Sequence, residues 1–179
     1  RFKGANLFFT ILIFGAFIPY QIMIYPLVIL LRDLGIYTKL PGLILIHSIF
    51  GMPILTLLFR NYFTTIPEEL FKAARVDGAK FWGIYFRVMM PMSLPIFVVA
   101  IIMQVTGIWN DFLFGSTFSF GKAAPIQVAL NNMVLSSTSV KEYNVDMASA
   151  IIAGIPTLIV YVLAGKYFIR GLTSGAVKG

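Results

Sequence analysis

The chain has 179 residues, of which 59% are hydrophobic and 12% are charged, and it contains no cysteine. Soluble domains have about 45–50% apolar and about 25% charged residues, so this composition excludes a soluble globular protein and predicts an integral membrane protein, with no disulfide or thiolate metal site. The formal net charge of +7 does not indicate a nucleic-acid partner, because an excess of Lys and Arg in so apolar a chain is typical of cytoplasmic loops.

Four segments almost free of charge reach the roughly 20 residues that a helix needs to cross a membrane. The chain opens at Arg1 and Lys3, without an initiator methionine or a signal peptide, and we interpret this as an N-terminally truncated start. Residues 1–179 are predicted to form one all-α transmembrane domain. Its spans are expected at about 5–30, 41–59, 90–110 and 147–166, with connecting loops at 60–91 and 115–145.

Proline and histidine inside the spans each allow two interpretations. Pro19 and Pro26 predict either a kink beside a pore or an ordinary helix end near Tyr20, because proline lacks the N–H donor of a helix interior. His47 could serve as a proton relay, but we favour a hydrogen-bonding role toward a neighbouring helix or the interface.

Basic residues predict the orientation of the chain. Ten of the fourteen Lys and Arg residues lie at the N-terminus, in the 60–91 loop and in the C-terminal tail, and four spans would place all three segments on one side. Cytoplasmic segments carry the excess of basic residues, so this side is predicted to be cytoplasmic. The loop at 115–145 is then expected on the extracytoplasmic side.

The outer end of the third span holds candidate contacts for a transported solute. Asn110 and Asp111 could line a vestibule and hydrogen-bond a hydroxylated solute, while Trp109 is expected at the membrane interface. Gln104, about two turns deeper, could lie on a translocation path or form a hydrogen bond between helices.

The polar loop at 60–91 predicts a helix, a glycine turn and a second helix. Thr65 and Glu68 have the spacing of a capping box, with Pro67 in the first turn, so a helix of about three turns is expected to begin near Ile66. Gly78 is expected to end it in the left-handed conformation, and a second helical stretch follows over 79–90. The small side chains of Ala73 and Ala74 would let a partner approach closely, although alanine is also simply a good helix former.

The sequence contains no arrangement typical of an enzyme. No nucleophile–base–acid set, phosphate-binding glycine loop or metal-ligand spacing is present, and the single histidine excludes an all-histidine metal site. We therefore expect no catalytic residue, no cofactor and no metal.

Three motifs resemble the permease subunits of ATP-binding-cassette (ABC) importers. Lys72-Ala73-Ala74, three residues, Gly78, nine residues and Val88-Met89-Met90-Pro91 match the spacing of their cytoplasmic signature, E-A-A, x3, G, x9, I-x-L-P. Trp109-Asn110-Asp111-Phe112 and the run at 170–179 are similar to the carbohydrate branch of these permeases. The resemblance is to the second permease subunit of maltose and glycerol-3-phosphate type systems, and it covers nearly the whole chain.

The resemblance implies a type I ABC importer permease bundle in a prokaryotic plasma membrane. Its loop helix, the coupling helix, would dock on a cytoplasmic ABC ATPase dimer whose closure drives alternating access. A second permease subunit and an extracytoplasmic solute-binding protein would complete the system, and membrane lipid would surround it. Lys72 stands where the family has an acidic residue, so either Glu68 and Glu69 supply the carboxylate or the contact is electrostatically altered. The implied coupling residues are Glu68, Glu69, Lys72, Ala73, Ala74, Asp77 and Gly78.

Three alternatives remain at this level. An ion-coupled transporter or channel would need charged groups inside the membrane, and the uncharged segments have none. A permease for another small solute, such as an amino acid or a phosphate ester, is disfavoured by the carbohydrate-like motifs. A truncated, non-transporting scaffold would bind the ATPase without moving a solute.

Overall fold

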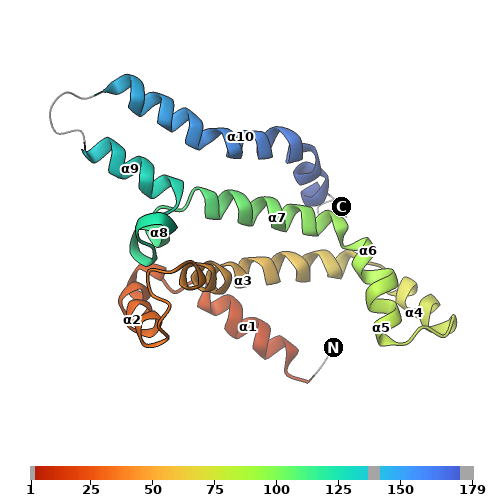
Figure 1. Cartoon of the computed structure of the whole chain (residues 1–179). Coiled ribbons are helices and arrows are strands. Elements are labelled where there is room, and N and C mark those ends of the chain that lie inside the picture. Colours follow the sequence, from red (N-terminus) through yellow and green to blue (C-terminus); the bar gives the residue numbers. More distant parts are fainter. Residues whose placement is uncertain (1–2, 137–141, 174–179) are drawn as a thin grey trace.

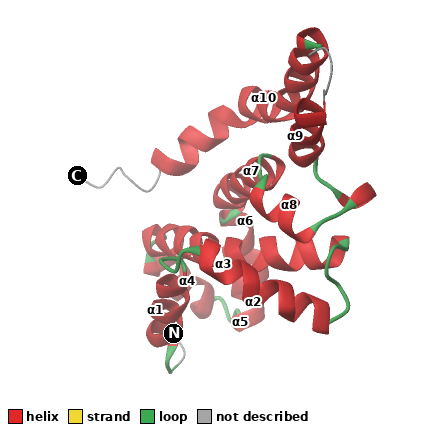
Figure 2. Cartoon of the chain, turned by 90° about the vertical axis from the view of Figure 1, so that its left-hand side faces the viewer, coloured by secondary structure: helices red, strands yellow, loops and turns green. Residues whose placement is uncertain are grey.

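The computed structural model describes residues 3–136 and 142–173, and this part of the chain contains only helices, turns and loops (Figure 2). The predicted all-α class is confirmed. Arg1, Lys141 and the tail motif beyond Thr173 lie outside the described residues. The helices are α1 (Ala5–Gly15), α2 (Tyr20–Asp33), α3 (Leu40–Thr65), α4 (Glu68–Val76), α5 (Phe81–Ile84), the π-helix η1 (Tyr85–Met89), α6 (Met90–Met92), α7 (Leu94–Trp109), α8 (Leu113–Phe118), the 3-10 helix η2 (Gly121–Ala123), α9 (Ile126–Ser136) and α10 (Tyr143–Thr173).

Four helices that are distant in the chain are stacked in the order α1, α3, α7 and α10, and neighbours in the stack contact each other (Figure 1). Among the described residues, α3 and the 143–165 part of α10 are each long and apolar enough to cross a membrane. Two bent pairs, α1 with α2 and 81–92 with α7, pass the same test when each pair is taken together. The number of spans reaches the predicted four if each bent pair crosses as one.

The first predicted span is broken at its first proline. α1 and α2 meet at 99°, and Pro19 is the N-cap residue of α2. Proline disfavours the helical conformation in the residue before it and cannot donate to a preceding turn, so the break falls before Pro19. Pro26 lies inside α2 and does not end it. The helix therefore begins, rather than ends, at Tyr20.

The start of the third predicted span is also bent. The 81–92 segment meets α7 at 64°, and the bend lies at Ser93, whose buried hydroxyl donates to the Met89 carbonyl at 2.5 Å. Pro91 and Pro95 flank this point and remove two helix donors. The straight part of this span, α7, begins at Leu94 and has 16 residues, and it reaches membrane length only together with the 81–92 segment.

The segment 115–145, predicted as a connecting loop, contains most of α8, η2, α9 and the start of α10. Phe114 and Phe118 of α8 pack in a buried cluster with Leu31 and Ile46. A Cβ on Gly115 would lie 2.9 Å from Pro125, so only glycine allows this close approach. Tertiary packing thus orders α8, in a region whose Ser, Asn and Gly content indicated a loop.

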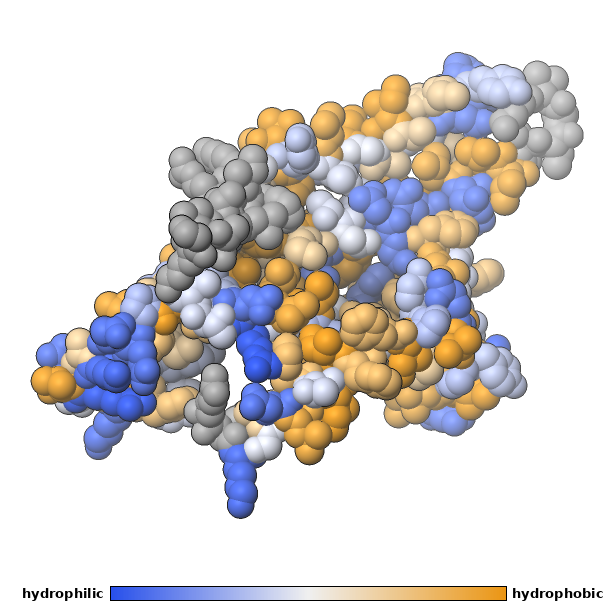
Figure 3. Space-filling view, turned by 180° about the vertical axis from the view of Figure 1, so that it is seen from behind, coloured by the Kyte–Doolittle hydropathy of each residue, from blue (hydrophilic) through white to orange (hydrophobic). Residues whose placement is uncertain are grey.

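The surface of the helical stack is mostly apolar. Figure 3 shows hydrophobic residues over much of this face and a concentration of hydrophilic ones at the end where α4 and α5 lie. Large apolar side chains are exposed along α1, α2, α7 and α10. Such an extended apolar surface fits contact with lipid or with further transmembrane helices.

Candidate functional site

The candidate docking element is α4, which follows α3 after a two-residue link, Ile66 and Pro67. Its first turn holds Glu68 and Glu69 and its last turn holds Arg75, an arrangement that complements the helix dipole. The capping-box prediction is wrong. The Thr65 hydroxyl donates to the Tyr62 carbonyl at 2.8 Å, and α4 has no side-chain cap. Because α3 continues to Thr65, this side chain belongs to its last turn and bonds backward within it.

The end of α4 is a Schellman motif centred on Gly78. The N–H of Ala79 donates to the Ala74 carbonyl at 2.9 Å, and the N–H of Gly78 donates to the Arg75 carbonyl at 3.0 Å. Gly78 has φ +80°, which confirms the predicted left-handed conformation. These bonds satisfy carbonyls that would otherwise be unpaired, so α4 ends rigidly at this turn.

The candidate coupling residues divide between two faces of α4. Glu68 and Lys72 lie on the face that lines a groove against α1 and α3, and their side chains form an exposed ion pair at 3.9 Å. The opposite face is exposed to solvent, and we call it the docking face. It consists of Glu69, Ala73, Val76 and Asp77.

Val76 is a docking-face residue that is not among the coupling residues expected from the sequence. Its side chain is 87% exposed, although valine is usually found inside proteins. Its position three residues after Ala73 was the signal that could have identified it. Ala74, by contrast, is half-buried and belongs to the motif that ends the helix.

The second predicted helix of the loop, 79–90, is divided into α5, η1 and α6. Within it, the Met90 N–H donates to the Tyr85 carbonyl, the spacing of a π-helix. Aromatic rings of this segment stack on one another: the Trp82 and Phe86 ring centroids are 5.8 Å apart. The helix–turn–helix order is confirmed, but no sequence signal indicated the π-helical turn.

The two ends of the 60–91 loop are held together by contacts between the end of α3 and the segment that leads into α7. The Tyr62 hydroxyl of α3 donates to the Met92 carbonyl of α6 at 2.5 Å. One turn farther into the bundle, the Phe59 and Phe97 rings meet edge to face with centroids 4.8 Å apart. A displacement of α4 would therefore act on α3 and α7 together. Tyr62 could not be identified from the sequence, because it and its partner Met92 are thirty residues apart.

The candidate residues of the translocation path, Gln104 and Asn110, contact different helices. Gln104 of α7 packs against Gly51 of α3, where an added Cβ would collide with the Gln104 amide. The Asn110 Oδ1 accepts long hydrogen bonds from Thr157 of α10 at 3.4 Å and from Gln127 of α9 at 3.5 Å. The structure therefore places these two side chains between helices.

Asp111 caps the start of α8. Its carboxylate accepts the N–H groups of Phe114 at 3.2 Å and Gly115 at 2.8 Å. His47 Nε2 lies 3.7 Å from the same carboxylate, beyond hydrogen-bonding distance, and its ring meets Phe114 edge to face. Trp109, expected at an interface, also donates to the Ala153 carbonyl of α10 at 2.9 Å.

Comparisons with known proteins agree with this architecture. Residues 1–172 match the family described as binding-protein-dependent transport system inner membrane component. The chain is 49% identical over 167 residues to a probable ABC transporter permease protein of Pyrococcus horikoshii, an alignment that covers 93% of the chain and 60% of the relative. It is 34% identical over 183 residues to the xylose/arabinose import permease protein XacI of Haloferax volcanii, covering 90% of the chain and 59% of that protein.

A solved structure has the same fold. It is a bacterial ABC transporter involved in the import of the acidic polysaccharide alginate, with a TM-score of 0.75 and 24% identity, and the match covers 94% of this chain and 63% of that one. The chain spans about three fifths of the length of the relatives that it matches. On the strength of the family match along nearly its whole length, the chain belongs to the inner-membrane components of binding-protein-dependent transport systems.

Proposed function

We propose that this chain forms part of a permease subunit of an ATP-driven importer for a sugar or sugar derivative, with α4 as its coupling helix. The observation that supports α4 most directly is its docking face: four exposed residues on a short, rigidly ended helix. The xylose/arabinose permease among the relatives supports the sugar. The chain itself would not be an enzyme, since a separate subunit would hydrolyse ATP.

The partners follow from this proposal. A cytoplasmic ABC ATPase dimer would contact the docking face, a second permease subunit would complete the translocation path, and an extracytoplasmic solute-binding protein would deliver the sugar. Loop 60–91 and the C-terminus would lie in the cytoplasm of a prokaryotic cell, consistent with the basic residues of the loop. Asn110, Asp111 and Gln104 remain the proposed residues near the path.

The mechanism depends on the way in which α4 is connected to the long helices α3 and α7. When the ATPases close, they would push α4, and the Ile66–Pro67 link would pass this movement to α3. The hydrogen bond from Tyr62 to the Met92 carbonyl and the contact of Phe59 with Phe97 would carry it to α7. The two membrane helices would then tilt together and expose the path to the other side.

Ala73→Glu is expected to lower ATPase binding at least tenfold, because the longer charged side chain would be forced into the contact and lose its water. Glutamate is a good helix former, so α4 itself should persist. The measurement is a pull-down in detergent of the protein with candidate ATPase subunits. Ala73→Ser, which keeps the side chain small, is the matched control. Equal binding by both variants would contradict the docking face.

Tyr62→Phe is expected to leave ATPase binding unchanged and to reduce several-fold the solute transported per ATP hydrolysed. The substitution removes one hydrogen bond, worth about 1 kcal/mol, between α3 and α6, the short helix that leads into α7. Uptake and hydrolysis are measured in proteoliposomes with the assembled complex. Tyr161→Phe, on an exposed part of α10, serves as the control. An unchanged ratio in Tyr62→Phe would show that this link does not transmit the movement.

A further inference from the structure

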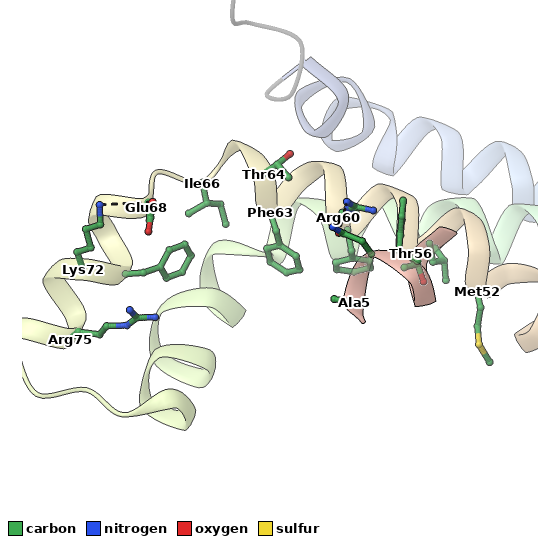
Figure 4. Close-up of a pocket in the computed structure, with 15 residues that line it drawn as sticks. Ala5, Met52, Thr56, Arg60, Phe63, Thr64, Ile66, Glu68, Lys72 and Arg75 are labelled. Atoms are coloured by element: carbon green, nitrogen blue, oxygen red, sulfur yellow. Dashed lines mark hydrogen bonds and ion pairs between the residues drawn. The ribbon is translucent and has the colours of Figure 1, made fainter. Parts of the chain in front are cut away.

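A groove of about 980 Å³ runs along α3 between α1 and α4, and none of the four docking-face residues lines it. Figure 4 shows Met52 at one end, Arg60 in the middle, and Lys72 and Arg75 of α4 at the other end. Other lining residues follow the same order: Leu55 and Thr56 lie toward Met52, and Glu68 and Phe71 lie toward Arg75.

The polarity of the groove changes with depth as it does in one leaflet of a bilayer. Met52 lies near the middle of α3, and Arg60 lies eight residues farther along, which is about 12 Å along the helix axis. Half the thickness of a hydrocarbon core is about 15 Å. The apolar end therefore reaches toward the bilayer centre, while the basic end lies where headgroups begin.

The basic end has an excess of positive charge. From the middle of the groove to its α4 end, the lining contains Arg60, Lys72 and Arg75 and a single carboxylate, Glu68, which is paired with Lys72 at 3.9 Å. This pairing leaves the two arginines as the uncompensated charges of the lining. Arginine presents a planar fork of donors that matches phosphate oxygens.

Arg60 is held in place for such a contact. Its guanidinium lies over the Phe9 ring of α1, 3.7 Å from the centroid, and one nitrogen lies 3.4 Å from the Asn6 Oδ1. The residue is nevertheless exposed, so its remaining donors can reach a ligand. Stacking on an aromatic face reduces the freedom that the side chain would lose on binding.

We propose that this groove binds one anionic phospholipid from the leaflet on the α4 side. The phosphate would lie at Arg60, Arg75 would attract it from the α4 end of the groove, and an acyl chain would follow Met52, Leu55 and Phe59 toward the bilayer centre. Charge complementarity favours an anionic headgroup. The apolar side chains that line the rest of the groove, among them Phe9 of α1 and Met52 and Leu55 of α3, favour a lipid over a soluble anion.

The test is a lipid titration of the full chain in detergent, in which native mass spectrometry measures the bound lipid. The two lipids compared are phosphatidylglycerol and phosphatidylcholine with identical acyl chains. Phosphatidylglycerol is expected to bind at least fivefold more tightly. Each of Arg60→Gln and Arg75→Gln should weaken it about fivefold, since a basic residue near an anionic membrane surface contributes about that factor. Equal binding of the two lipids, or no effect of either variant, would overturn the proposal.

Two further variants separate binding from damage to the fold. Glu68→Gln removes the carboxylate of the lining and should tighten phosphatidylglycerol binding, a gain that misfolding cannot produce. Arg32→Gln removes a matched arginine, stacked 4.9 Å from the Tyr37 ring near the opposite end of α3, and should leave binding unchanged. Loss of binding in Arg32→Gln, or displacement of the lipid by millimolar inorganic phosphate, would contradict a lipid site in the groove. No ATPase or solute enters this measurement, so its outcome is independent of the proposed transport function.

Discussion

Gly78→Val is expected to abolish ATP-driven uptake while the protein remains folded and in the membrane. Gly78 has φ +80°, a conformation that costs an ordinary L-residue roughly 1–2 kcal/mol and a β-branched residue more. An added Cβ would meet no atom within 4 Å, so the penalty comes from the backbone alone. The strain would open the Schellman bonds and release the last turn of α4, which carries Val76 and Asp77.

The measurement compares solute uptake with ATP hydrolysis in proteoliposomes that contain the assembled complex. Gly78→Asn is the conservative variant and should retain most uptake, because asparagine tolerates the left-handed region. Gly121→Val places the same residue at another positive-φ glycine, φ +60°, far from α4, and should leave coupling intact. Normal uptake by Gly78→Val would mean that a rigid end of α4 is not needed.

Asp111→Ala is expected to destabilise the protein by about 3 kcal/mol. The carboxylate accepts two backbone N–H bonds at the start of α8, and each hydrogen bond to a charged group contributes roughly 1.5–3 kcal/mol. Alanine would leave both donors unpaired beside the buried Phe114 and Phe118 cluster. Thermal unfolding in detergent should show a midpoint lower by on the order of 5–10 °C.

Two neighbouring variants make this result specific. Asp111→Asn keeps one acceptor oxygen and should lose about half as much stability. Asn110→Ala removes only hydrogen bonds of 3.4 and 3.5 Å and should change the midpoint little. An Asp111→Ala protein with a normal midpoint but no uptake would instead assign Asp111 to the solute path rather than to the support of α8.

Local features of the docking loop could be predicted because they depend on residues close in the chain. The left-handed turn at Gly78 follows from a glycine placed after a helical stretch, and the bonds that form it join residues no more than five apart. The capping box failed for a tertiary reason. A capping box requires Thr65 to be the non-helical N-cap residue of α4. α3 extends six residues beyond the predicted end of its span, so Thr65 is instead the last residue of α3.

Contacts between distant residues could not be predicted in the same way. The side chains of Tyr62 and Trp109 donate to the carbonyls of Met92 and Ala153, which lie thirty and forty-four residues away. Every residue has a backbone carbonyl, so no sequence motif marks the acceptor. The burial of α8 likewise depends on the packing of Phe114 and Phe118 against Leu31 and Ile46, which are distant in the chain.

By itself the sequence determined the all-α membrane class, the family resemblance and the position of α4, because apolar length, turn chemistry and motif spacing are local properties. Only the tertiary structure decided which residues of α4 face outward, how its movement would reach both long helices, and where arginines meet an apolar groove. Those features require segments from different helices to meet, and the packing of the whole chain selects which of them do.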